Sequence, residues 1–569
     1  MTTANPTQST DVPPYPAEQI ANATYPERCK LTAQNWAFAS PNRPSVMALY
    51  WIKYLGVLIP IWAFWCSFNA DYPGFFAFSE WAFTGEAFKK AMVWSMCWEL
   101  FGFGCGWGPM NARYEQWYGG YRHFTRTGTI KLPLFPGVPL IGGNTRNFLD
   151  VGLYSLNQVL LLWALIQPEM TPTLLLPCVI LVVLNGILDK TLYLMARSEH
   201  YLVVIAAITF AFADELWISG AKLTWSFIWI WAAVSKWNSH FPSVIMVMMN
   251  NGPFFPKMLK KNLFTDYPDN ITPSRFARFM AFFGHVSEFS IPLILFYGTA
   301  TGNAWVLLGG CILFTGFHGF IGLNNPAGMP VEWNILMIYG GWNLFWFHPE
   351  ASILEMTQMP ILFGVMLFSL VAIPLIGNFF PERLSFLLSM RYYAGNWAYN
   401  VWLFKKDSDH REKLNKIKKP STTVLEQLEG MLEDPNELAA AKAAMGANRQ
   451  LHLQGRPLLE ALPVAVGSAI DEYEWQEGET FGGTVLGWNF GDGHLNGEEL
   501  MQRMQPICGF EKGQLRLISV ESQPLFGPTM HWRVYCPVDG KIAEGKTKMA
   551  DYKENQPWPE GEVAAALTR

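Results

Sequence analysis

About ten apolar segments, each long enough to cross a bilayer, occupy most of this chain. They lie near residues 46–68, 87–109, 150–167, 173–196, 199–219, 223–249, 278–298, 303–322, 331–348 and 359–380. About 20 apolar residues in a helix span the hydrocarbon core, and lipid tolerates only helices or closed barrels, because backbone polar groups must be satisfied internally. The sequence therefore predicts an all-α polytopic membrane bundle of about ten transmembrane helices.

Polar segments flank these spans and set the expected domain organisation. We expect a polar arm over residues 1–45, the helix bundle over 46–380, and a small C-terminal soluble α+β domain over 407–569. The soluble part opens with Ala-, Leu- and Glu-rich helical stretches, and strand-like runs such as TVLGWNF and HWRVYCPV follow. The stretch 381–406 mixes apolar, aromatic and basic residues, which predicts an amphipathic helix in the membrane interface.

Basic residues gather in alternate loops, while the loops between them are acidic or neutral. By the positive-inside rule, this alternation predicts that both termini are cytoplasmic. The cytoplasmic loop 110–148 is rich in Gly and Pro, and three interpretations stay open: it docks on lipid headgroups, covers a site as a lid, or merely connects two spans. Charged residues are only 15% of the chain and form no basic tract. Membrane lipids are thus the expected partners, nucleic acid is not, and protein partners are unknown.

The segment 223–249 carries the strongest functional signal, because a lysine, Lys236, lies near its middle. A charge at bilayer depth costs roughly 2.5–3.5 kcal/mol on insertion scales, so such residues usually face a polar bundle interior and mark function. At helical spacing, Trp225, Trp229, Lys236 and His240 form one aromatic and basic stripe. A desolvated lysine can act as a general base, whereas the structural alternative is a lysine paired with a carboxylate.

Other polar groups within the spans are weaker candidates. His285 and Glu288 form an H-x-x-E pair that could handle protons or join two helices, and His318 is a lone histidine among Gly and Phe. No second E-x-x-H exists for a di-metal bundle, and the cysteines form no CxxC pair, so no metal site is expected. The counter-ion of Lys236 stays open among groups at span ends, which are Asp189, Glu199, His200, Asp214 and Glu215.

Three stretches resemble the vitamin K-dependent γ-carboxylase-like, horizontally transferred transmembrane superfamily. AAVSKWNSHF resembles its G-x-x-K-L-x-x-x-W segment, FGHVSEFSIPLILF its following acidic helix, and FHGFIGLNNPAGMPVEWNILMI its histidine-bearing helix. The resemblance implies that Lys236 is the base that deprotonates a reduced quinone-type vitamin and that His318 is the later histidine. Trp237 and Phe241 depart from the motif, and the family's lumenal C-terminal domain is absent. The whole chain also resembles an uncharacterised bacterial transmembrane family, which implies a bacterial inner membrane.

Two functions remain open at this point. The first is a membrane enzyme that uses lysine base chemistry on a lipid-soluble substrate or quinol. In it Lys236 is the base, His240 tunes it, and His318, Glu288 or His285 handles protons. Trp225 and Trp229 would face a flat ring, so a quinone-type cofactor is one candidate. The alternative is a non-catalytic lipid-binding or transport component. The sequence fixes neither the substrate nor the presence of a cofactor.

Overall fold

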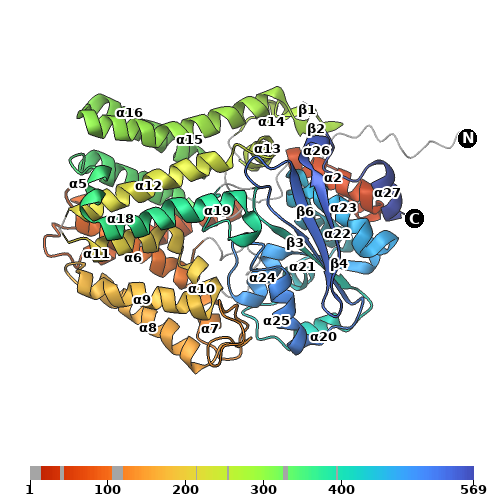
Figure 1. The fold of residues 1–569 in the computed structure, drawn as a ribbon. Coiled ribbons are helices and arrows are strands. Elements are labelled where there is room, and N and C mark those ends of the chain that lie inside the picture. Colours follow the sequence, from red (N-terminus) through yellow and green to blue (C-terminus); the bar gives the residue numbers. More distant parts are fainter. Residues whose placement is uncertain are drawn as a thin grey trace, which may run out of the picture.

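Helices form most of the molecule, and a sheet lies at one end of the helical bundle (Figure 1). The computed structural model describes residues 14–38, 44–104, 119–212, 215–252, 255–323, 331–392 and 395–568. Figure 1 shows the bundle helices running side by side toward the sheet, with α2 on the sheet's side together with the C-terminal helix α27. The two ends of the described chain therefore lie at the same end of the molecule.

Five helical stretches of the described residues are long and apolar enough to cross a membrane: Ala48–Cys66, Phe148–Leu165, Arg275–Thr301, Ala304–Leu323 and Pro360–Phe379. The expectation of about ten spans is not met by this measure, because several of the other apolar helices are short or carry charges. The bundle helices are α3 (Pro44–Lys53), α4 (Ile59–Cys66), α5 (Phe78–Trp81), α6 (Gly85–Leu100), α8 (Phe148–Leu165), α9 (Pro172–Leu188), α10 (Lys190–Met195), α11 (Val203–Phe210), α12 (Leu216–Ser235), α13 (Phe241–Asn251), α14 (Lys257–Lys261), α15 (Arg275–Thr301), α16 (Ala304–Leu323), α17 (Val331–Gly341), α18 (Pro360–Leu367) and α19 (Ile373–Phe379).

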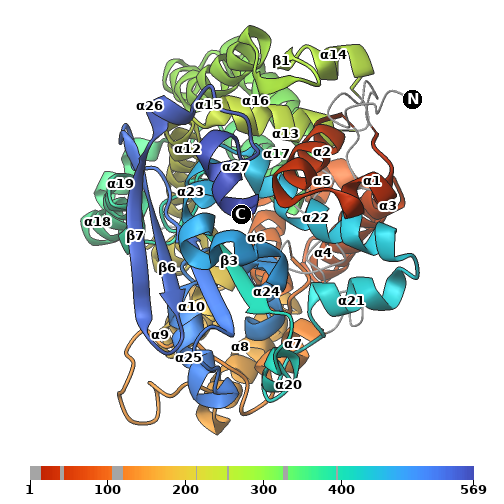
Figure 2. The ribbon, with the colours of Figure 1, turned by 90° about the vertical axis from the view of Figure 1, so that its right-hand side faces the viewer.

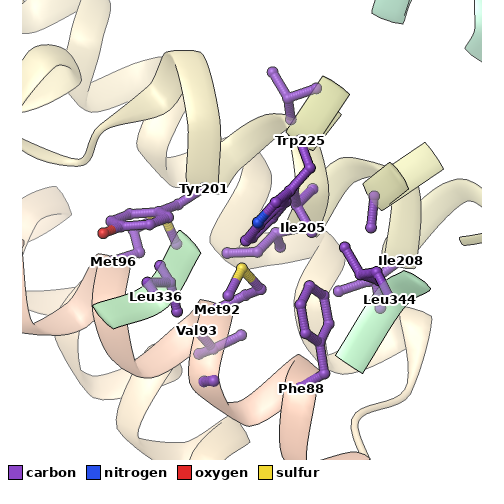
Figure 3. Packing of buried hydrophobic residues seen from close by; sticks show 14 of the residues in the cluster. Phe88, Met92, Val93, Met96, Tyr201, Ile205, Ile208, Trp225, Leu336 and Leu344 are labelled. Carbon is purple, nitrogen blue, oxygen red and sulfur yellow. The ribbon is translucent and has the colours of Figure 1, made fainter. Parts of the chain in front are cut away.

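The interior of the bundle is a continuous aromatic and aliphatic core. Figure 3 shows part of it, where Phe88 and Met92 of α6 lie near Ile205 of α11 and the Trp225 ring of α12. Trp225 is fully buried, and its indole nitrogen donates to the backbone carbonyl of Met337. A large aromatic ring buried in this way contributes packing area to the fold.

The C-terminal part contains a five-stranded sheet in the order β4-β3-β5-β6-β7, and every neighbouring pair is antiparallel. Its strands are β3 (Tyr399–Lys405), β4 (Tyr473–Glu477), β5 (Leu515–Val520), β6 (Thr529–Cys536) and β7 (Gly540–Lys548), while β1 (Phe264–Asp266) and β2 (Asn270–Pro273) form a separate hairpin. The helices of this part are α20 (His410–Leu414), α21 (Val424–Met431), α22 (Pro435–Leu451), α23 (Gly455–Val466), α24 (Gly478–Leu486), α25 (Glu498–Cys508), α26 (Met549–Tyr552) and α27 (Gly561–Thr568).

Strand β3 alternates between two cores, because successive side chains of a strand point to opposite faces. Val401 and Leu403 pack in the cluster that contains Leu458 and Leu462 of α23. Trp402 and Phe404 pack in the other cluster, with α24 and α25. The expected amphipathic helix over 381–406 is thus wrong, because the described residues of this stretch form a short 3-10 turn at Pro381–Arg383, irregular turns, and then the doubly buried strand β3. The C-terminal sheet region accordingly begins before residue 407.

Residues 119–147, the described part of the expected loop 110–148, join the bundle to the sheet domain. They include α7 (Gly119–Phe124) and a bridge between Ile130 and Thr145. Phe124 and Ile130 belong to the same core cluster as Trp402. Buried ion pairs, Lys131–Asp150 at 2.6 Å and Arg146–Asp189, tie the segment to α8 and α9. The segment therefore connects and packs, and it lies away from the Lys236 cavity described below.

The expected polar arm over residues 1–45 contributes two helices, α1 (Ala17–Asn22) and α2 (Tyr25–Phe38), to the soluble part. Figure 2 shows α1 and α2 beside α22, on the side of the sheet domain that faces the viewer. Arg28 of α2 forms an ion pair with Asp471 at 3.0 Å, and the Cys29 thiol accepts a hydrogen bond from Gln450. The first described helices, α1 and α2, thus pack onto the C-terminal region of the chain.

Candidate functional site

The helix that carries Lys236 is interrupted at the lysine. Helix α12 ends at Ser235, Lys236 caps it, and α13 begins at Phe241 with His240 at its N-cap position. Pro242 occupies the first turn of α13, where its missing N–H is tolerated and its fixed φ favours a helix start. The expectation of one continuous helix over 223–249 is wrong, so Lys236 lies at a bend between two helices rather than in mid-helix.

The ammonium group of Lys236 forms an ion pair with the carboxylate of Glu288 on α15. The two residues are only 7% and 4% exposed. The rings of Phe241 and Phe317 lie 5.8 Å from the same ammonium, at cation–π distance. A buried charge needs such compensation, because an isolated ion away from water is very costly. Glu288 is therefore the counter-ion, and the expectation that the counter-ion is a group at a span end is wrong.

His318 of α16 is held by two neighbours. The indole nitrogen of Trp229 donates to its Nε2 at 2.8 Å, and its Nδ1 lies 2.8 Å from Oδ1 of Asn334. An indole N–H is only a donor, so Nε2 is the acceptor and the ring proton resides on Nδ1, which donates to Asn334. This arrangement fixes one neutral tautomer of His318 and the plane of its ring.

Lys236, Glu288 and His318 line one cavity of about 490 Å³. This volume falls within the range of roughly 300–1,000 Å³ typical of small-molecule sites. The rest of the wall is almost wholly apolar, with Ile228, Trp229 and Met337 among its members. A few convergent polar groups in a large apolar cavity are the usual form of a ligand site.

One side of the cavity opens at the surface of two candidate membrane spans. Phe283 of α15 and Ile312 of α16 line the cavity and are nevertheless 57% and 60% exposed. Both helices are among the five apolar stretches of spanning length. Aromatic side chains of the chain that follows the last span also line the cavity, including Tyr392, Trp397 and Phe490. The C-terminal sheet region thus forms part of the cavity wall.

A loop of the sheet domain supports the bend that carries Lys236. The side-chain amide of Asn238 donates to the carbonyls of Gln523 and Pro524 at 3.1 and 3.2 Å, and its oxygen accepts from the Phe526 backbone at 3.0 Å. Nδ1 of His240 lies 3.2 Å from Oε1 of Gln523. The connection between β5 and β6 is therefore hydrogen-bonded into the break between α12 and α13.

The structure brings four of the seven predicted site residues together, namely Lys236, Glu288, His318 and Trp229. His240 is displaced, because the break turns it toward Gln523 instead of keeping it one turn beyond Lys236. Trp225 is a core residue away from the cavity, and its ring lies 4.8 Å from that of His200. His285 lies outside the cavity lining, with its ring against Phe282.

A second buried group of charges lies next to aromatic residues that line the cavity. It was not predicted as a cluster from the sequence. Arg197 contacts Glu199 at 2.9 Å and Glu99 at 3.9 Å, while Trp98 donates to Glu332 at 3.0 Å. The guanidinium of Arg197 stacks at 5.1 Å over the ring of Trp333, which itself lines the cavity. The sequence does contain a signal for this cluster. Charged residues occur at the ends of several predicted spans, and these segments fold together.

Two remaining expectations concern metals and counter-ions. Asp214 lies outside the described residues, and Asp189 pairs with Arg146 instead of Lys236. Within the described ranges, no cluster of three or more His, Cys, Asp or Glu side chains has the geometry to hold a metal ion.

A family model described as a transmembrane protein of unknown function, DUF3556, matches residues 7–568. The chain belongs to this family. It is thus an integral, multi-pass membrane protein with buried charged residues. No curated protein and no solved structure matches the chain. For this DUF3556 member the cavity geometry therefore carries the functional argument.

Proposed function

We propose that this protein is a membrane enzyme that removes a proton from a lipid-soluble substrate bound in the Lys236 cavity. The observation that carries the proposal is the meeting of the Lys236–Glu288 ion pair with the fixed imidazole of His318 in one apolar chamber. Polar groups are rare in membrane interiors and usually mark a functional site.

The Lys236–Glu288 pair supports the base role. Transfer of one proton from the ammonium to the carboxylate yields a neutral amine and a neutral acid, and an apolar cavity disfavours separated charges. The neutral amine has the lone pair that a base requires. His318 keeps its proton on Nδ1, and its Nε2 becomes an acceptor for substrate once the Trp229 indole moves away. The resemblance to the γ-carboxylase-like superfamily, in which the matching lysine is the base, favours the same role.

The wall of the cavity supports a lipid-soluble substrate. Apart from the polar groups named above, the lining consists mainly of aliphatic and aromatic side chains. The opening between Phe283 and Ile312 lies on apolar spans, so a substrate dissolved in the bilayer reaches the site without crossing water. A quinone-type ring fits this chemistry, since the Trp229 face and the Phe317 ring offer flat apolar surfaces. The loop charges favour a cytoplasmic position for the soluble domain and both termini.

The test is Lys236→Arg in native membranes, followed by lipid analysis. Arginine keeps a cation opposite Glu288 but cannot give up its proton under ordinary conditions. We expect normal protein abundance together with loss of a lipid-soluble product and accumulation of its precursor. Lys222→Arg is the matched control, because Lys222 is an equally buried lysine of α12 that binds the carbonyls of His348 and Ala351, away from the cavity.

An unchanged lipid profile at normal abundance of Lys236→Arg contradicts the base role. In that case the charge of the residue matters and its proton does not, which is the result expected of a lipid-binding or transport component. Trp229→Phe is a second test of the site. It removes the indole donor and so frees Nε2 of His318 without removing an ionisable group.

A further inference from the structure

A second cavity, of about 680 Å³, lies where the bundle meets the sheet domain. Its bundle side is formed by the end of α9, by α10 and by the chain around Leu388. Its other side is formed by the turn at Asp492–Leu495, the start of α25, and strands β5 and β6. An ion pair of 2.5 Å between Lys190 and Glu499 joins the two sides at this place. Figure 1 shows α10 beside α25 at the same junction.

A histidine between two carboxylates forms the polar side of this junction cavity. Nε2 of His494 lies 3.0 Å from Glu521, and Nδ1 lies 3.8 Å from Asp492. Burial opposes the charge of the imidazole, but the two carboxylates outweigh burial and raise the pKa of His494. Two carboxylates therefore flank one imidazole, and the buried guanidinium of Arg391 acts on the same group.

Asp492 is the residue that points to a ligand. It is 1% exposed, and its Oδ1 accepts a hydrogen bond from the backbone N–H of His494 at 3.0 Å. Its other oxygen, Oδ2, accepts no hydrogen bond from the described residues. A buried acceptor left without a donor costs roughly 1–3 kcal/mol, and more when it is charged. A donor supplied by a bound molecule removes this cost.

The charged side chains that line the junction cavity are mostly acidic. Five carboxylates line the junction cavity, against three lysine or arginine side chains and His494. The carboxylates are Glu382, Asp492, Glu498, Glu499 and Glu521. Because these groups do not form a metal cluster within the described part of the chain, an organic cation with N–H donors suits the site better than a metal ion.

The bundle side of the junction cavity is apolar. Val183 and Ile187 of α9 and Leu388 line it, and Val183 is also partly exposed on the outer surface of the helix. Helix α9 is a short apolar helix of the bundle. An apolar body can therefore lie along α9 while a polar head reaches Asp492 and Glu521.

We propose that the junction cavity binds the primary ammonium head of an amphiphile, with Asp492 and Glu521 as acceptors and the α9 wall holding the apolar body. One N–H group of the ammonium would donate to Oδ2 of Asp492, which accepts no hydrogen bond from the described residues. Arg383 and Arg533 also line the cavity, so a phosphate next to the ammonium has cationic partners. The site is separate from the Lys236 cavity and stands without the proposed function.

The test compares two lysophospholipids with the full-length protein in detergent. Lysophosphatidylethanolamine and lysophosphatidylcholine of equal chain length share phosphate and acyl chain, but the second carries methyl groups in place of N–H donors. We expect the ethanolamine lipid to raise the melting temperature and to bind at least about tenfold more tightly by native mass spectrometry. We expect Asp492→Asn to abolish this preference.

Asp492→Asn is chosen because the amide oxygen still accepts from the His494 backbone, while an NH₂ group replaces the oxygen that lacks a donor. Asp539→Asn is the control, since Asp539 is an exposed acid of the same domain paired with Lys512. If Asp492→Asn fails to fold, Glu521→Gln takes its place, because a glutamine oxygen still accepts from the Ser522 backbone.

Each outcome has a fixed meaning. Equal binding of the two lipids, or an undiminished preference in Asp492→Asn, overturns the proposal. Stabilisation by Mg²⁺ alone that Asp492→Asn removes also overturns it, in favour of a metal site. Free ethanolamine that binds as tightly as the ethanolamine lipid overturns the amphiphile, because the α9 wall then contributes nothing to binding. Loss of lipid turnover in Lys236→Arg leaves this result untouched.

Discussion

At the scale of single residues, the buried ion pair makes a prediction about stability. Removing one partner of a buried pair leaves an uncompensated charge and costs about 3–5 kcal/mol, whereas replacing both partners by apolar groups is often neutral. We therefore expect Lys236→Met alone to lower the melting temperature strongly, and the double variant Lys236→Met with Glu288→Met to recover most of the loss. Thermal melting in detergent measures both. Equal melting of the single and double variants contradicts the pairing.

Glu474 of the sheet domain makes a prediction about pH. Burial opposes its charge, but His410 at 3.7 Å and Arg411 at 2.5 Å outweigh burial and lower its pKa to about 2. A carboxyl whose pKa is lower in the folded state stabilises the fold above its unfolded pKa. That contribution, roughly 3 kcal/mol at most, disappears as pH falls from about 5 toward 2.

We expect Glu474→Gln to lower the melting temperature at pH 7 and to make the loss of stability below pH 5 shallower. Melting curves at a series of pH values measure the slope. Glu412→Gln, which neutralises an exposed acid of the same region, controls for the loss of a surface charge. If Glu474→Gln loses stability below pH 5 as steeply as the natural protein does, then other titratable groups cause this loss.

Some residues of the site could be predicted from the sequence, and others could not. Lys236, Glu288 and His318 could be named from sequence, because an ionisable group in an apolar segment is costly wherever it lies. His240 could not be placed, since helical spacing was extended across a break that Asn238 and Pro242 mark only weakly. On α15 the cavity face is occupied by Met280, Gly284 and Glu288. His285 lies one position beyond Gly284, about 100° around the helix.

At the scale of elements, α17 packs closely on α12 at a glycine. A Cβ atom on Gly340 would overlap the ring of Trp225, and this ring is buried in the core drawn in Figure 3. Packed interiors tolerate added volume poorly, and overpacking typically costs about 1–3 kcal/mol. We expect Gly340→Ala to lower the melting temperature.

Gly364→Ala is the matched control for Gly340→Ala. Gly364 lies inside α18, and nothing lies within 4 Å of an added Cβ. Alanine favours a helix over glycine by roughly 0.5–1 kcal/mol, so the melting temperature should stay level or rise slightly. A comparable loss in both variants indicates that the helices respond to glycine replacement in general and not to contact with Trp225.

Elements were predictable where one pattern dominated. The stretches Arg275–Thr301 and Ala304–Leu323 match their expected spans closely, because long apolar runs have no other stable form in lipid. Strand β3 was mistaken for a helix because a strand buried on both faces gives a continuous apolar run, which periodicity cannot distinguish from a helix. Fewer candidate spans than the expected ten occur among the described residues, because several of the predicted apolar segments are short, charged or interrupted helices.

At the scale of the whole molecule, the bundle and the sheet domain share a core. One cluster contains Phe124 and Leu192 from the bundle side together with Trp402 and Phe481 of the soluble part. Separation of the two parts would expose these side chains to water, at about 25 cal/mol per Å² of apolar surface. We expect a single cooperative melting transition of the full-length protein.

Calorimetry in detergent measures this cooperativity, and intrinsic tryptophan fluorescence gives an independent probe. Coincident transitions by both methods agree with one folding unit. Two transitions separated by many degrees contradict it and show that the sheet domain folds as an independent body. The shared core was out of reach of sequence reasoning, because pairing of distant segments such as Phe124 with Trp402 leaves no local pattern.

The bend beneath the amine of Lys236 rests on a turn that the chain supplies long after its last span. Gln523, Pro524 and Phe526 close a hairpin of the sheet and at the same time brace Asn238. A premature stop codon before this turn spares every membrane helix, yet it removes the brace. Late truncations of the gene should therefore have the same effect as substitutions in the Lys236 cavity itself. The membrane helices need the C-terminal part of the chain to form this cavity.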